Sequence, residues 1–289
     1  MTEMERSLSK REARIILELE WWGHKIITLS ELHERLGGSE GDARVFAHRL
    51  VKKGWLERLK PGLFQLIPAD RGPDGIADTH PLIAGTALAD PYFFSFGTAC
   101  LHYGFTDQVF AEVYIACQDR RRPAEIRGKR YVFVHVPEEQ FFGHTEDTVL
   151  GQVVNIATTE RALLDAIDRP RYSGGIREVS RIVRRSVKRI SWESLLDLLT
   201  QWHSSALVQR LGYFLDLHKT DFPSEFRSEL LKLIRPSSKI QLGARRKWGT
   251  TGSLIRPWNV VENVPRNALL PEGDVSRDPE VLPPKGGAH

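Results

Sequence analysis

The alternation of apolar and polar residues is most regular between Ser39 and Pro68, where it predicts a helix followed by a hairpin. From Gly41 to Lys53 the apolar residues recur at the i, i+3, i+4, i+7 spacing of an amphipathic helix; they are Ala43, Phe46, Ala47 and Leu50. Gly54 follows as a typical C′ glycine, which ends the helix. Apolar residues then flank the turn Lys60-Pro61-Gly62 on both sides, as they do in a two-stranded hairpin.

The preceding residues extend this pattern toward the N-terminus. Residues Ser7 to Trp22 have apolar positions at helical spacing, and Ser30 is a suitable N-cap for a short helix, Glu31 to Leu36, which Gly37 and Gly38 end. The order is helix, short helix, turn, helix and hairpin. It predicts a winged helix-turn-helix domain over residues 1–68, whose second helix of the pair would lie in the major groove of DNA.

Positive charge is concentrated in the same segment. Between Arg44 and Lys60 there are six Lys or Arg residues and one acid, Glu57. The predicted DNA-binding residues are Arg44, His48, Arg49, Lys52 and Lys53 on the helix and Arg58 and Lys60 on the hairpin. The alternative is that these residues form only a solvated helix face.

The rest of the chain predicts a larger α/β domain, so the overall fold class is α+β. Residues 69–81 are rich in Gly, Pro and Asp, as in a linker, and residues 82–262 form the second domain. Its predicted strands are Val109–Cys117, Tyr131–Val136, Gln152–Ile156 and a closing strand at Gly252–Val261; helices dominate its C-terminal part. Residues 263–289 are predicted to be a disordered tail.

The composition indicates the cellular compartment of the protein but does not indicate a reaction or a ligand. The chain has 289 residues, a net charge of +4 and two cysteines, Cys100 and Cys117, in apolar surroundings. Free buried thiols in a reducing compartment explain these cysteines better than a disulfide or a zinc site. No signal peptide is visible, and no apolar run approaches the ~20 residues of a membrane span. We therefore expect a cytoplasmic protein without a membrane partner.

No set of residues predicts a catalytic, cofactor or metal site. The chain lacks a phosphate loop, a dinucleotide-binding glycine motif and a nucleophile elbow. Asp165 and Asp168 are interpreted as a solvent-facing helix end. Asp119, Glu125 and Lys129 are residue types of a metal nuclease, but Glu and Lys are four residues apart rather than two, so a nuclease is a minor alternative.

Two further basic or glycine-rich segments leave alternatives open. Ser173-Gly174-Gly175 precedes a basic helix, where it either cradles an anion or forms a turn that needs positive φ; the turn is favoured. The basic segment Arg120 to Arg130 either contacts DNA phosphate or an acidic protein surface, or it is a solvated loop.

Three segments resemble the AbiEi antitoxins of bacterial abortive-infection toxin–antitoxin pairs. They are residues 54–64, where the wing lies, residues 94–116, and residues 156–165 with the Gly174-Gly175 turn. In the wing, Leu63 and Phe64 replace a Tyr that is usual in the family. The resemblance implies a non-enzymatic repressor that binds inverted repeats in its own promoter and neutralises a nucleotidyltransferase-like toxin in phage defence.

The resemblance assigns no toxin-binding residues, so charge is the remaining guide. A nucleotide-binding toxin pocket is acidic around its metals, and we expect basic residues to meet it or a phosphate: Arg181, Arg184, Arg185, Arg245, Arg246 and Lys247. An inverted repeat would require two chains on the DNA. The main alternative is a winged-helix regulator whose second domain senses a small ligand.

Overall fold

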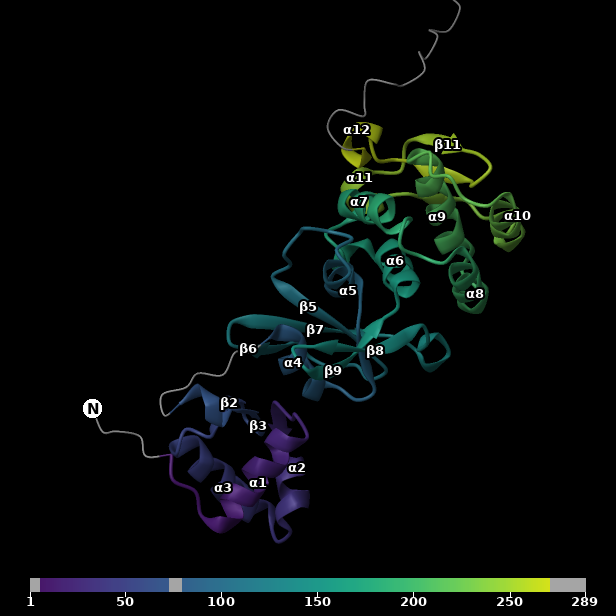
Figure 1. Cartoon of the computed structure of the whole chain (residues 1–289). Coiled ribbons are helices and arrows are strands. Elements are labelled where there is room, and N and C mark those ends of the chain that lie inside the picture. Colours follow the sequence, from purple (N-terminus) through teal and green to yellow (C-terminus); the bar gives the residue numbers. More distant parts are fainter. Residues whose placement is uncertain (1–5, 73–79, 271–289) are drawn as a thin grey trace, which may run out of the picture. The chain divides into compact units, whose positions relative to one another are not determined.

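The computed structural model describes residues 6–72 and 80–270 and contains both helices and sheets (Figure 1). Contacts divide the chain into two compact units, one formed by residues up to Ser95 with residues 110–158, the other by residues 96–109 with those from Thr159 onward. The predicted α+β class with an N-terminal winged helix is confirmed. The predicted domain boundaries stay a prediction, and most of the predicted linker, residues 73–79, lies outside the described residues.

Three helices and a three-stranded sheet form the N-terminal region. The helices are α1 (Lys10–Trp21), α2 (Leu29–Leu36) and α3 (Glu40–Lys52), and the strands are β1 (Ile26–Thr28), β2 (Leu56–Lys60) and β3 (Leu63–Leu66) in the order β1-β3-β2. The predicted hairpin is β2–β3, turning at Gly62 with φ of 76°. Strand β1 was not predicted, because three residues are too few for a periodic pattern.

Side-chain caps fix where the two helices of the helix-turn-helix begin. The Ser39 hydroxyl accepts a hydrogen bond from the Asp42 amide, and the Asp42 carboxylate accepts one from the Ser39 amide, so α3 begins with a capping box. Thr28 and Glu31 form the same arrangement at the start of α2. The predicted N-cap, Ser30, was therefore wrong, because Thr28 is the residue whose capping box places Glu31 at N3.

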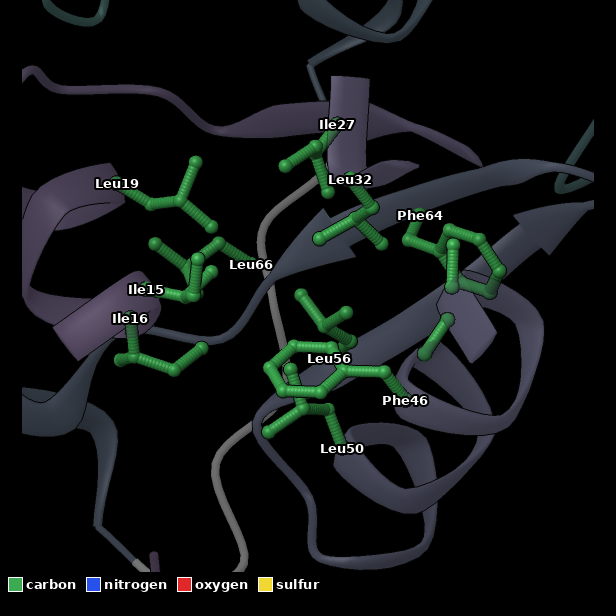
Figure 2. Packing of buried hydrophobic residues seen from close by; sticks show 12 residues of the cluster. Ile15, Ile16, Leu19, Ile27, Leu32, Phe46, Leu50, Leu56, Phe64 and Leu66 are labelled. Carbon is green, nitrogen blue, oxygen red and sulfur yellow. The ribbon is translucent and has the colours of Figure 1, made fainter. Parts of the chain in front are cut away.

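The apolar stripe of α3 packs into the core of this region. Phe46 and Leu50 lie among Leu56 of β2 and the α1 residues Ile15 and Ile16 (Figure 2). All are nearly inaccessible to solvent, and burying a side chain of this size contributes about 1.5–3 kcal/mol. This packing fixes the rotation of α3 about its own axis, so the opposite face of the helix is held toward solvent.

A six-stranded mixed sheet completes the first unit. Its order is β6-β7-β5-β4-β9-β8. The strands are β4 (Tyr92–Phe94), β5 (Glu112–Cys117), β6 (Ala124–Ile126), β7 (Lys129–His135), β8 (His144–Val149) and β9 (Gln152–Ala157). The predicted strands correspond to β5, β7 and β9. Strands β4, β6 and β8 were missed because two are only three residues long and β8 is mostly polar. The short helix α4 (Pro81–Gly85) contacts β5 and β9.

The second unit is mainly helical. Its longer helices are α5 (Phe96–His102), α6 (Thr159–Asp168), α7 (Ile176–Ser186), α8 (Trp192–Trp202), α9 (Ser205–Leu217) and α10 (Ser224–Leu233). A small sheet combines β10 (Ile240–Gln241), β11 (Ser253–Ile255) and β12 (Val260–Glu262), and two one-turn helices, α11 (Arg245–Trp248) and α12 (Arg266–Leu269), accompany it.

Three predictions in this unit need correction. The closing strand is a hairpin, β11–β12, because the chain reverses between Ile255 and Val260. Residues 263–270 belong to the fold rather than to a tail, since Val264 and Leu269 are buried; residues 271–289 lie outside the described residues. Asp165 does not face solvent: it is buried and accepts a hydrogen bond of 3.0 Å from Arg161 Nε, also buried.

Candidate nucleic-acid interface

The solvent face of α3 carries most of the predicted DNA-binding residues. Arg44, Val45, His48, Arg49 and Lys52 are all exposed, whereas the four apolar residues of the other face are buried. Val45 is 58% exposed and adds one apolar side chain to this face. A cationic face with one apolar side chain can contact phosphates, guanine edges and a thymine methyl group.

Arg44 has an intrahelical partner that DNA can replace. Its Nη2 lies 2.7 Å from Glu40 Oε1, one turn earlier, and both side chains are more than half exposed. Exposed pairs of this kind contribute about 0–1 kcal/mol, so exchanging the carboxylate for a phosphate costs little. Glu40 and Asp42 make the first turn of α3 acidic, which leaves Arg49 and Lys52 as the cationic part of the face, with His48 beside them.

Lys53 does not belong to this face. Its Nζ lies 2.7 Å from Oε2 of Glu12 on α1, and that carboxylate is 4% exposed. The predicted DNA-binding role of Lys53 is thus unsupported by its position, because the ammonium group points toward α1. Periodicity could not reveal this, since Lys53 is the C-cap residue and Glu12 is forty-one positions away.

The two predicted wing residues differ in their accessibility. Arg58 is exposed on β2, and Lys60, at the end of that strand, is half-buried. Burial lowers the pKa of Lys60, because the charged form loses solvation, and the positive charge of Arg121 adds to this effect. Arg58 is therefore the wing residue best placed to meet a phosphate.

The basic segment after β5 is largely engaged within the protein. Arg121 donates to the Leu88 carbonyl and pairs with Asp119, and Lys129 Nζ donates to the Phe110 carbonyl at 2.6 Å. In the nuclease alternative, two of the three residues are therefore engaged elsewhere: Asp119 with Arg121, and Lys129 with the Phe110 carbonyl. Within residues 6–72 and 80–270, no group of three or more His, Cys, Asp or Glu side chains could hold a metal ion.

The predicted toxin or phosphate residues fall into two groups. On α7, Arg181 pairs with Glu178 and Arg185 pairs with Asp107, while Arg184 is exposed. On α11, Arg245 contacts Gln241, and Arg246 and Lys247 are exposed. The start of α7 and α11 meet at Trp248, whose ring lies under the guanidinium of Arg177 and beside Lys247; Arg177 was not among the predicted residues. The clusters of basic residues in the sequence did not predict that Trp248 would lie among these cations.

None of the helices in the described part of the chain combines the length and hydrophobicity that a membrane crossing requires.

Comparisons with known proteins agree with the geometry of the N-terminal region. The crystal structure of the RV2827C protein from Mycobacterium tuberculosis superposes with a TM-score of 0.59, at 18% identity, over 89% of this chain and 93% of that one. At this identity the likeness concerns the fold alone. No curated protein matches the chain. Residues 14–67, from α1 to the end of the wing, match a family model described as transcriptional regulator, AbiEi antitoxin. The similarity to AbiEi antitoxin regulators predicted from the sequence is therefore confirmed for the N-terminal region, residues 14–67.

Proposed function

We propose that this protein is the antitoxin of a toxin–antitoxin operon, that it binds its own promoter as an autorepressor, and that it counteracts a nucleotidyltransferase-like toxin without being an enzyme. The observation that carries the proposal is the exposed cationic face of α3 inside a region that matches antitoxin regulators. The protein acts in the cytoplasm, where its operator and its toxin are. Two chains occupy the two halves of an inverted repeat.

The core of the N-terminal region explains how α3 would enter the major groove. Phe46 and Leu50 pack into the core on one face of the helix, so His48, Arg49 and Lys52 project together from the opposite, solvent-exposed face. Arg49 is the residue for a bidentate guanine contact, because only a guanidinium offers two parallel donors. Lys52 and Arg58 contact phosphates on either side of the groove.

Fluorescence anisotropy tests the repressor part of the proposal. The full chain is titrated against its own upstream duplex and a scrambled duplex of the same length, each over a salt series. We expect tighter binding to the upstream duplex, with affinity that falls linearly in log salt. Equal affinity for both duplexes at every salt concentration would refute promoter recognition.

Co-expression tests the antitoxin part. The toxin is taken from the neighbouring reading frame, and growth is measured with and without this chain. We expect rescue by the wild-type chain and weaker rescue by Arg184→Glu, since Arg184 is exposed and, unlike Arg181 and Arg185, has no carboxylate partner among the described residues. Lys239→Glu, a charge reversal at an exposed lysine just before β10, is the matched control. Undiminished rescue by Arg184→Glu would exclude this part of α7 from toxin binding.

A further inference from the structure

A cavity of about 750 Å³ lies in the second unit, between the start of α7 and the segment Leu242–Trp248. Five cationic side chains line it, and one carboxylate, Asp168, faces them. The cations are Arg169, Arg171, Arg177, Arg210 and Lys247. They come from four separate stretches of the chain, so the fold, and not a single charge run, produces this concentration of positive charge.

Arg210 of α9 is the most buried of these cations. Its Nε is shielded from solvent and has no hydrogen-bond partner. Burial lowers the pKa of Arg210 even though the charge of Asp168 opposes that effect. A desolvated guanidinium is costly, and because Arg210 lines the cavity, an anion bound there would stabilise its charge.

The N-terminus of α7 also lacks acceptors for its amides. Gly175 is its N-cap and provides no capping side chain, so the first-turn amides and the positive end of an 11-residue helix are open toward the cavity lining. The adjoining Ser173 Oγ is fully buried and has no hydrogen-bond partner either. Gly174 and Gly175 have φ of 79° and 86°, so the turn interpretation of this motif is confirmed, and the same turn lets the backbone border the cavity.

Trp248 closes another side of the cavity. A Cβ at Gly243 would lie 2.6 Å from Trp248 Cδ1, so only glycine lets the indole pack this closely. The Arg177 guanidinium lies 5.1 Å and the Lys247 ammonium 5.5 Å from the ring centroid, distances of cation–π contacts. These contacts keep two cations at the rim of the cavity, although the two repel each other.

The one carboxylate neutralises only part of this charge. Asp168 pairs with Arg169 at 3.2 Å. Burial raises the pKa of Asp168, and Arg169 counteracts this effect. The remaining cations therefore face the cavity with a clear excess of positive charge.

We propose that this cavity binds the phosphate or polyphosphate group of a small molecule. A tetrahedral phosphate group would accept from Arg210 and from the first amides of α7, while Arg177 and Lys247 would neutralise its outer oxygens. This inference goes beyond the proposed repressor and antitoxin function, because it concerns the second unit and requires neither DNA nor toxin. If the protein is instead a winged-helix regulator whose second domain senses a small ligand, this inference implies that the ligand carries a phosphate group.

Isothermal titration calorimetry of the full chain tests the proposal, with inorganic pyrophosphate and ATP as separate probes. We expect one saturable site per chain for at least one probe. Lys247→Ala should raise its Kd about tenfold, and Arg210→Gln should raise it further, because Arg210 supplies a desolvated donor. Lys239→Ala, an exposed change just before β10 and outside the lining, should leave the Kd unchanged. Binding of ATP but not pyrophosphate would identify a nucleotide, and the reverse an inorganic anion.

Thermal melting of each variant identifies one that fails to fold; Lys247, being exposed, is the safer of the two substitutions. The proposal is overturned if neither probe saturates the wild-type chain below millimolar concentration, or if Lys239→Ala weakens binding as much as Lys247→Ala. It is also overturned if a short RNA binds through these residues far more tightly than either small molecule, because the site would then serve a macromolecule.

Discussion

Lys53 Nζ donates a hydrogen bond of 2.7 Å to Glu12 Oε2, linking the end of α3 to the buried side of α1. The Ser9 amide donates to the same carboxylate oxygen. This contact fixes the angle between the first helix and the recognition helix, and so the direction in which the cationic face of α3 points.

Lys53→Met is expected to destabilise the N-terminal region by about 3 kcal/mol, because it leaves the Glu12 carboxylate buried without its cation. Hydrogen exchange of α1 and α3 amides in the full chain measures the loss. The double variant Glu12→Gln with Lys53→Met should recover part of it, and Lys52→Met, one residue away and exposed, should cost little. Equal losses of stability for Lys52→Met and Lys53→Met would show that the Lys53–Glu12 ion pair does not stabilise the N-terminal region.

Acid should weaken the same contact. Burial alone would raise the pKa of Glu12, but the hydrogen bonds from Lys53 and Ser9 together lower it. A carboxyl with a lowered folded-state pKa stabilises the fold above its unfolded value, about 4.3, and this contribution is lost as the pH falls through the folded value. Exchange protection of α1 should therefore fall more steeply below pH ~4 in the wild type than in the double variant. If exchange protection of α1 fell with pH equally in the wild type and the double variant, Glu12 would not be the carboxyl responsible.

Arg49 and Lys52 are expected to affect DNA binding in different ways. Arg49→Ala should cost about 1–3 kcal/mol on the upstream duplex and much less on scrambled DNA, as for a guanine contact. Lys52→Ala should weaken both and lower the salt slope by about one. Anisotropy titrations measure each. Arg14→Ala, an exposed change on α1 at an ion pair with Glu18, is the control. Equal losses on both duplexes for Arg49→Ala would show that Arg49 contacts only phosphate.

The buried pair Arg161–Asp165 is expected to be sensitive to removal of one partner. Asp165→Asn should cost about 3–5 kcal/mol, because the Arg161 guanidinium, stacked 4.1 Å from the Trp202 ring centroid, stays buried without its anion. Urea denaturation followed by circular dichroism measures this cost. Lys232→Met breaks an exposed pair with Glu229 and should cost less than about 1 kcal/mol. Similar losses of unfolding free energy for Asp165→Asn and Lys232→Met would mean that burial does not make the Arg161–Asp165 pair more sensitive than an exposed pair.

Both cysteines should be unreactive in the folded protein. Burial raises the pKa of the Cys100 thiol strongly and that of Cys117 as well, so neither forms the nucleophilic thiolate at neutral pH. Ellman's reagent at pH 8 should label them only when urea unfolds the chain. Fast labelling of either thiol without denaturant would show that it is accessible. The absence of a disulfide agrees with the sequence prediction of free buried thiols.

Local sequence patterns were enough to predict the winged helix-turn-helix and the basic face of its recognition helix. Both depend on local rules: the 3.6-residue spacing of Phe46 and Leu50, the C′ position of Gly54, and the turn at Gly62 are properties of neighbouring residues. Because Phe46 and Leu50 must face the core, the charged residues between them must face solvent.

Which charged side chains form ion pairs, and where positive charge is concentrated, depends on contacts between residues that are distant in the sequence. Lys53 finds Glu12 across forty-one positions, and Arg210 joins Lys247 in one cavity. Gly212 is needed because Trp258, far along the chain, packs where its Cβ would lie. No periodic pattern contains such pairings, since they depend on how separate elements meet. Periodicity tells which face of a helix is buried, but not which distant residue it is buried against.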